Sequence, residues 1–181
     1  MRTSLIITLA FLSFTLISCS GKKEDKLSLQ DRNSPLFTSM TNIGNTHVHI
    51  EFNAPNVNGR KIFGELVPFD KVWTTGIPKV TTLQLYNNVM LNGQPVAAGK
   101  YGLYTIPGEK EWTVMLNWDT ESLTGSEYPA ESEVMRFTVK PEPLPNVQER
   151  LRFEVKQTDQ KQGFIAIEWE KTRISFEVTE Q

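Results

Sequence analysis

The chain has few of the residues on which common catalytic sites depend. Its 181 residues include one cysteine, Cys19, and two histidines. A single cysteine excludes a disulfide within the chain, so its thiol is free, shared with another molecule or modified. No G-x-S-x-G sequence occurs, so the nucleophile elbow of many hydrolases is absent. The sequence therefore offers no recognisable catalytic set, and nothing in it calls for a cofactor.

The charge balance and the hydrophobic runs exclude two further classes of protein. The chain carries 19 Lys and Arg residues against 21 Asp and Glu, for a net charge of −2. No basic stripe forms, which argues against nucleic acid as a partner. The apolar run Leu5–Ile17 is shorter than the roughly 20 residues that a membrane-spanning helix needs. Its length is typical of the apolar core of a signal peptide.

The beginning of the chain has the pattern of a bacterial lipoprotein leader. Arg2 supplies a positive charge, Leu5–Ile17 follows, and the run ends in Leu-Ile-Ser-Cys at Cys19. We expect residues 1–18 to be a signal peptide that is removed, after which Cys19 carries lipid, including palmitate. The alternative is an uncleaved N-terminal anchor helix. Lipidation predicts a protein held on a membrane of the cell envelope, at the periplasmic or cell-surface face of the outer membrane.

A polar stretch separates this anchor from the rest of the chain. Residues 19–34 are rich in charged and small side chains, which is typical of a flexible tether. Residues 35–181 then form one domain, because the remaining length is that of a single core and no internal repeat or second boundary is found.

The domain has the patterning of an all-β protein. Ten prolines recur along it, so no long helix fits between them. Two-residue alternation of apolar and polar side chains indicates about nine strands, and the turn signals Asn92-Gly93 and Pro107-Gly108 fall between strands. The expected strands are 46–52, 80–86, 89–91, 100–106, 111–117, 134–139, 151–155, 164–169 and 174–178. We predict a single antiparallel β-sandwich, jelly-roll-like, with residues 141–145 as a crossover loop.

Several motifs of the domain resemble those of a known family. They are the stretch from Asn58 to Gly76, which contains Gly-Arg-Lys-Ile-Phe-Gly, the stretch 98–108, and Glu-Trp-Thr-Val at 111–114. Together they resemble domain-of-unknown-function family 2911, a bacterial family, over about residues 34–178. The resemblance implies an all-β exported domain, often lipid-anchored, without an assigned activity.

The chain departs from that family pattern at its polar positions. The pattern has Tyr-Ser-Arg-Pro where this chain has residues 52–55, Arg where it has Thr74, and Ala-Asn-Glu-Ala where it has residues 77–80. Two arginines and an Asn–Glu pair are therefore missing, while Arg60 and Trp73 remain. The resemblance thus implies a conserved fold, with a polar site that is lost or adapted to another ligand.

One strand carries a candidate metal site. His47, His49 and Glu51 alternate, so all three lie on one face, and the His-x-His spacing can present two imidazoles to one metal ion. Further ligands would have to come from a neighbouring strand. The alternative is a solvent-facing polar stripe opposite the apolar residues of the same strand.

Four residues are candidates for ligand binding. Trp118 and Tyr128 flank the polar loop 119–129 and could form a platform for a sugar ring or peptide, and Trp73 belongs to the same aromatic set, although aromatic side chains also fill cores. Arg60 follows the turn Asn58-Gly59. It could grip an anionic ligand, or form a structural ion pair with a carboxylate.

These observations favour a non-enzymatic function. We expect a lipid-anchored envelope module that binds a small molecule, a glycan or a protein, and whose contact with the membrane is its lipid anchor. The alternatives are a hydrolase whose site is built from scattered strand residues, and a structural subunit of an envelope complex.

Overall fold

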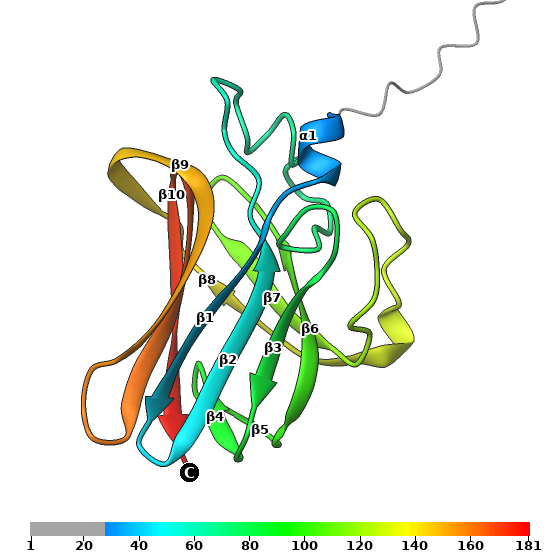
Figure 1. The fold of residues 1–181 in the computed structure, drawn as a ribbon. Helices are drawn as coiled ribbons and strands as arrows, with labels where there is room; N and C mark the ends of the chain where they lie inside the picture. Colours follow the sequence, from blue (N-terminus) through cyan, green and yellow to red (C-terminus); the bar gives the residue numbers. More distant parts are fainter. Residues whose placement is uncertain (1–27) are drawn as a thin grey trace, which may run out of the picture.

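Alternating side chains form ten strands in the part of the chain that the structure, a computed structural model, describes, residues 28–181 (Figure 1). The strands are β1 (Leu36–Ile43), β2 (Thr46–Asn53), β3 (Thr81–Leu85), β4 (Val89–Leu91), β5 (Gln94–Val96), β6 (Gly99–Ile106), β7 (Trp112–Asn117), β8 (Glu133–Val139), β9 (Glu142–Gln157) and β10 (Gln162–Glu180). A short helix, α1 (Leu29–Arg32), precedes β1, and a 3-10 turn, η1 (Ala130–Ser132), precedes β8. The predicted signal peptide and Cys19 lie outside the described residues.

The strands form two antiparallel sheets. One has the order β1-β2-β3-β6-β7-β8 and the other the order β5-β4-β10-β9. The predicted all-β sandwich is confirmed. The strand order refines the jelly-roll-like expectation, because the larger sheet is a meander that is interrupted once, where β4 and β5 cross to the other sheet.

The core lies between the sheets and is built by the alternation that the sequence shows. In β2, the side chains of Val48, Ile50 and Phe52 are buried while their neighbours face outward. From the opposite sheet, β10 contributes buried Ile167 and Trp169. Each such side chain contributes about 1.5–3 kcal/mol when it leaves water, so the alternation fixes which face of each strand turns inward.

Four parts of the sandwich differ from the sequence prediction. Strand β5 was not predicted, since it has three residues of which two are exposed. Strand β1 was not predicted, because most of its side chains are exposed and the alternation is weak. Residues 141–145, predicted as a loop, belong largely to β9. Because β9 is the edge strand of its sheet, it tolerates Pro143 and Pro145, which have no backbone N–H to donate to a neighbouring strand. The last two predicted strands are one strand, β10, which has irregular pairing with β9 around Glu170, a residue with φ of 56°.

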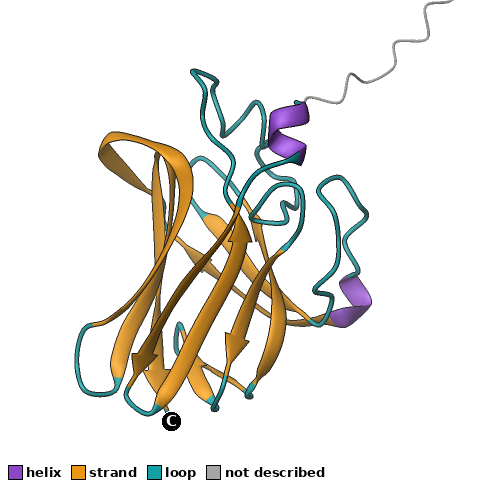
Figure 2. Cartoon of the chain, in the orientation of Figure 1, coloured by secondary structure: helices purple, strands orange, loops and turns teal. Residues whose placement is uncertain are grey.

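The loops of the sandwich are unevenly distributed. Figure 2 shows the long loops gathered at the end that carries α1, while the opposite end has short turns. Residues 28–34, which the sequence analysis placed in the tether, include α1 and are bonded to the body of the domain. No helix in residues 28–181 is long and apolar enough to cross a membrane.

Candidate functional site

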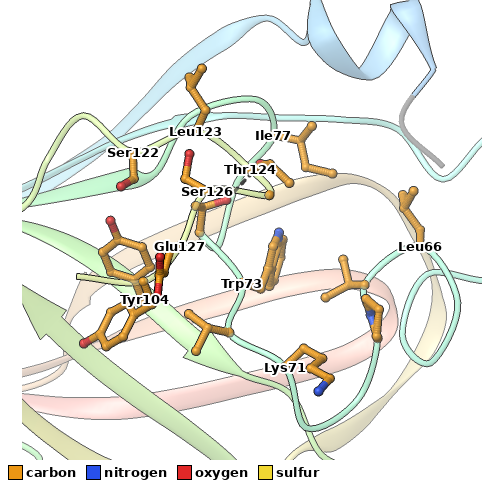
Figure 3. Close-up of a pocket in the computed structure, with 16 residues that line it drawn as sticks. Leu66, Lys71, Trp73, Ile77, Tyr104, Ser122, Leu123, Thr124, Ser126 and Glu127 are labelled. Carbon is orange, nitrogen blue, oxygen red and sulfur yellow. Dashed lines mark hydrogen bonds between the residues drawn. The ribbon is translucent and has the colours of Figure 1, made fainter. Parts of the chain in front are cut away.

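A pocket of about 650 Å³ lies among the long loops (Figure 3), and we call it the end pocket. One wall is the connection between β2 and β3, at residues 66–68, 71–74 and 77. The other wall is the loop 122–128, which follows β7. Tyr104 of β6 completes the lining. Two loops that lie far apart in the sequence thus form one site over the end of the larger sheet.

Backbone pairing fixes the first wall. Trp73 and Thr105 of β6 form a β-bridge, with N–O distances of 2.7 and 2.9 Å for their two hydrogen bonds. The chain then turns through Thr75, at φ 54°, to Gly76. A Cβ on Gly76 would lie 2.9 Å from Thr81 Oγ1 and 3.0 Å from the carbonyl oxygen of Lys79, so the turn leaves room for hydrogen only.

Trp73 joins the end pocket to the core. Its indole is 4% exposed and stacks on Trp169, with ring centroids 5.8 Å apart and planes at 20°. Phe63 packs edge-on against it at 6.0 Å. The Trp73 Nε1 has no hydrogen-bond partner in the described part of the chain. In Figure 3 this nitrogen lies on the side of the ring turned toward Ile77 and Thr124. Trp73 is therefore a rigid base beneath the pocket that is held in place from behind and exposes little of its own surface.

Asp119 fixes the base of the second wall. Its carboxylate accepts hydrogen bonds from the Tyr104 hydroxyl at 2.8 Å, from the Glu121 backbone N–H at 3.0 Å, and from the Ser122 hydroxyl. Burial raises the pKa of Asp119, but these hydrogen bonds outweigh it and the pKa lies below its usual value. Burial raises the pKa of Tyr104. The loop is thus anchored by a carboxylate that stays ionised.

Further bonds hold the loop against the first wall. The Thr124 N–H donates to the Pro78 carbonyl at 2.7 Å, and the Val80 N–H donates to the Ser122 carbonyl at 2.9 Å. The hydroxyls of Thr74 and Thr124 lie 2.9 Å apart, and both reach the Gly76 carbonyl. These contacts keep the two walls in place without a ligand, so the pocket is preformed.

Tyr128 closes the loop at its far end. Its ring packs edge-on against Tyr104, with centroids 5.0 Å apart, and its hydroxyl donates to Glu133 at 2.7 Å. Burial, together with the hydrogen bond to Glu133, raises the pKa of Tyr128 to about 12. The phenol therefore stays neutral in the physiological range.

Apolar side chains frame the mouth of the end pocket. Val72 is 41% exposed and Leu123 is 51% exposed, one on each wall. Among the lining residues, Lys71 and Glu127 are the charged ones, and both are exposed. The pocket thus combines an aromatic floor, apolar lips and two opposite charges at the surface.

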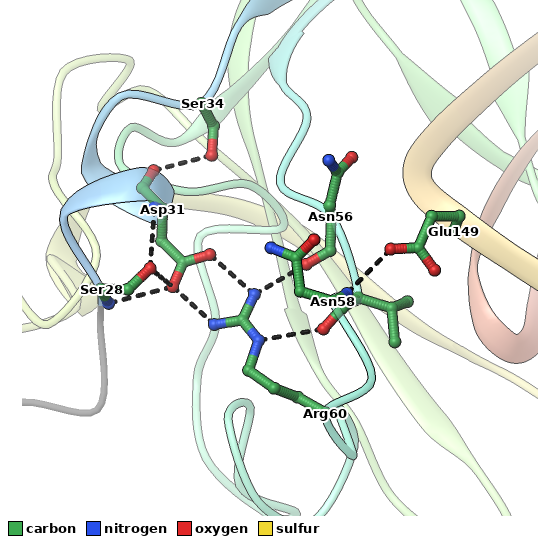
Figure 4. Close-up of polar contacts among 8 residues, drawn as sticks. Ser28, Asp31, Ser34, Asn56, Asn58, Arg60 and Glu149 are labelled. Carbon is green, nitrogen blue, oxygen red and sulfur yellow. Dashed lines mark hydrogen bonds and ion pairs between the residues drawn. The ribbon is translucent and has the colours of Figure 1, made fainter.

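Two of the four predicted ligand-binding residues, Trp73 and Tyr128, line the end pocket. Trp118 does not, since its exposed ring lies against Tyr101 with centroids 4.8 Å apart. Arg60 is also elsewhere, because its guanidinium is bound by Asp31 of α1 (Figure 4). The structural ion pair, one of the two interpretations of Arg60, is therefore the contact observed.

The candidate metal ligands lie on the outer face of β2. His49 and Glu51 line a shallow hollow of about 170 Å³ together with Lys100, whereas the Nδ1 of His47 lies 2.8 Å from the Asn42 side-chain oxygen. Within residues 28–181, no group of three or more His, Cys, Asp or Glu side chains is placed to hold a metal ion. The shared face matches the sequence pattern, and among the residues that line the hollow beside His49 and Glu51 is a lysine, Lys100.

Sequence reasoning missed several important lining residues. Leu123 gave no signal, because it is one apolar residue in a polar loop. Tyr104 belongs to the aromatic set that could form a platform, but it was not singled out because it sits in an ordinary strand. Thr74 and Ile77 were noted as departures from the family pattern, and both line the end pocket. At these two positions the lining of the pocket differs from that pattern.

The fold and the end pocket define a β-sandwich domain with a loop-built cavity at one end. Residues 34–178 match the model of a family described as protein of unknown function (DUF2911), so the chain belongs to this family. The resemblance drawn from its motifs is confirmed. Neither the curated proteins nor the solved structures include a match to the chain.

Proposed function

We propose that this protein is a lipid-anchored binding module of the cell envelope, and that the end pocket holds a small molecule. The observation that carries the proposal is the preformed pocket of about 650 Å³ over Trp73. Cavities of roughly 300–1,000 Å³ with apolar and aromatic walls and a few polar groups are typical small-molecule sites. The end pocket has this size and this lining.

The chemistry of the walls favours binding over catalysis. The Ser122 hydroxyl is the best-placed nucleophile, but its partner is Asp119, whose lowered pKa makes it a weak base. Both histidines are on the outer face of β2 and neither lines the pocket. A hydrolase would need a base with a pKa nearer neutrality beside Ser122, and the lining supplies none.

The lipid anchor is the second part of the proposal. Cys19 follows the leader pattern, and the described chain begins nine residues later at Ser28. The experiment is intact-mass measurement of the protein purified from membranes of its host. We expect a chain that begins at Cys19 and carries acyl chains, and Cys19→Ala to abolish both changes. A full-length, unmodified chain would contradict the anchor.

Ligand binding is tested with a pair of tryptophan substitutions on one loop. Ser126 is exposed and lines the end pocket, whereas Glu121 is exposed and does not. Ser126→Trp should fill the mouth, and Glu121→Trp should leave it open. We expect small molecules that are retained in native mass spectrometry by the parent protein and by Glu121→Trp to be lost from Ser126→Trp. Equal retention by all three, or turnover of the compound, would contradict a binding site here.

A further inference from the structure

Four hydroxyls in the lining of the end pocket, those of Thr74, Thr124, Tyr104 and Ser122, are already paired with the protein. The hydroxyls of Thr74 and Thr124 lie 2.9 Å apart and both lie within hydrogen-bond distance of the Gly76 carbonyl, so each has a partner within the protein for its one proton. Those of Tyr104 and Ser122 are held by Asp119. A glycan needs free donors and acceptors to replace its bonds to water, since an unpaired buried hydroxyl is costly. The pocket therefore favours an apolar ligand over a sugar.

The mouth is apolar as well as the floor. Val72 and Leu123 stand on opposite walls, and each exposes two fifths or more of its surface. Partly buried Leu66 lies on the same wall as Val72. Exposed apolar side chains that frame a cavity mark a surface that a partner or ligand covers. A ligand that is apolar along its length, rather than at one tip, would cover both the floor and the lips.

The end pocket lies at the end of the sandwich that carries α1, the first described element of the chain (Figure 1). Figure 1 places α1 at the same end as the loops that form the pocket. The Asn53 side chain donates to the Ser34 carbonyl at 2.9 Å, and the Asn53 carbonyl lies 3.6 Å from the position of a Cβ on Gly76. Nine residues from Cys19 to Ser28 span at most about 30 Å. An acylated Cys19 would therefore keep Ser28, where the described chain begins at the pocket end of the domain (Figure 1), within about that distance of the bilayer.

The charged groups at the rim allow a polar head on the ligand. Lys71 and Glu127 are exposed and of opposite sign, so the rim has no net charge. A head group would sit at the mouth in water while its chain runs over Trp73. This arrangement suits a molecule with one hydrocarbon chain, because the exposed apolar side chains Val72 and Leu123 lie on opposite walls and one chain between them would contact both.

From these observations we propose that the ligand of the end pocket is a single-chain amphiphile taken from the membrane, with its hydrocarbon chain over Trp73 and between Val72 and Leu123. The inference rests on the proposed function, which it deepens by naming the ligand class. A fatty acid, a monoacylglycerol and a lysophospholipid share this chemistry and differ in the head group that would face Lys71 and Glu127.

Photo-crosslinking of the lipid-anchored protein tests the inference. The protein is reconstituted in vesicles of phosphatidylethanolamine and phosphatidylglycerol that contain a diazirine-labelled fatty acid, irradiated, and mapped by peptide mass spectrometry. We expect labels on residues 66–77 and 122–128. An excess of unlabelled fatty acid, monoacylglycerol or lysophospholipid should suppress them, and the order of potency identifies the preferred head group. Maltotriose should have no effect.

Two charge substitutions at the mouth and one elsewhere provide the controls. Leu123→Glu and Val72→Glu place a carboxylate on either lip, and each should lower labelling about tenfold. Val147→Glu, at a half-exposed valine of β9 outside the pocket, should change it less than twofold. Because all three positions are exposed, their thermal unfolding should match that of the parent, which separates loss of binding from loss of folding.

The outcomes separate this inference from the proposed function. Labels spread over the outer face of the larger sheet, or unchanged by Leu123→Glu, would overturn the amphiphile. If water-soluble compounds occupy the pocket in the Ser126→Trp comparison while no amphiphile labels it, the ligand class is wrong and the binding module stands. If neither occupies the pocket, both proposals fail.

Discussion

The guanidinium of Arg60 binds both carboxylate oxygens of Asp31, with N–O distances of 2.6 and 2.9 Å (Figure 4). Its remaining donors reach the carbonyl oxygens of Asn56 at 2.7 Å and Val57 at 3.0 Å. Asp31 is 1% exposed and belongs to α1, while Arg60 follows the turn at Asn58. This bidentate pair therefore fastens α1, the first described element, to the loops at the pocket end of the domain.

Removing one partner of this pair should loosen α1. Asp31→Asn loses the charge-assisted bonds to Arg60, and we expect the free energy of unfolding to fall by about 1–3 kcal/mol. Urea denaturation measures the change, and proteolysis near residues 28–34 should become faster. Glu109→Gln, at an exposed residue, serves as the control and should change stability by less than about 0.5 kcal/mol. If Asp31→Asn had the same free energy of unfolding and the same rate of proteolysis as the parent, the proposal that this pair holds α1 in place would be contradicted.

The same pair should make stability depend on acid pH. Burial raises the pKa of Asp31, but hydrogen bonds from Arg60 and Ser28 outweigh it, so the pKa lies below the ordinary value of 3.8. The stabilisation is fully present above 3.8 and is lost as the pH falls from there through the lower folded-state pKa. We expect the advantage of the parent over Asp31→Asn to shrink below about pH 4 in urea denaturation series. An advantage that stays constant to pH 2 would contradict this assignment.

The phenol of Tyr128 should ionise at a higher pH than an ordinary tyrosine. Its folded-state pKa of about 12 exceeds the ordinary value of 10.0, because burial and Glu133 disfavour the phenolate. The unfolded chain therefore loses this proton first, and stability should fall as the pH rises from 10 toward 12. Absorbance at 295 nm should show a component near pH 12 that Tyr128→Phe removes. The same component in Tyr128→Phe would contradict the assignment.

Gly76 should be intolerant of a side chain for steric reasons. Gly76→Ala brings a Cβ within 3.0 Å of both Thr81 and Lys79, and we expect a loss of about 1–3 kcal/mol together with weaker ligand binding in the end pocket. Gly59→Ala is the comparison, since no atom lies within 4 Å there and its φ of 68° alone costs about 1–2 kcal/mol. Thermal unfolding measures the loss of stability in each variant, and native mass spectrometry measures its ligand binding. If Gly59→Ala also weakened ligand binding, the conclusion that the Cβ at position 76 acts directly on the end pocket would be contradicted.

The sequence predicted the fold well where burial follows a regular period. In β2 the apolar residues alternate without exception, so the strand and its inner face could be inferred. In β1 the residues Leu36, Phe37 and Met40 remain exposed, and the pattern is lost. The prolines near position 143 indicated a loop because a single sequence does not reveal that β9 is an edge strand.

The site was harder to predict because it depends on contacts between distant segments. Trp73 and Tyr128 were candidates on their chemistry alone, and both line the end pocket. That they share one pocket follows from Thr124 meeting Pro78 across the two loops, which no local pattern encodes. The partner of Arg60 was missed for the same reason, since Asp31 lies 29 positions earlier in a stretch with the composition of a tether.

The most direct measurement for the whole account is the indole N–H resonance of Trp73 while a single-chain amphiphile is added. Nitrogen–proton correlation spectra of the protein, with the resonance assigned through Trp73→Phe, are recorded during titration with monododecanoylglycerol. We predict that this resonance and the amides of residues 122–128 shift together and saturate. Shifts confined to the outer face of the larger sheet, around His49 and Tyr86, or no saturable shift at all, would contradict it.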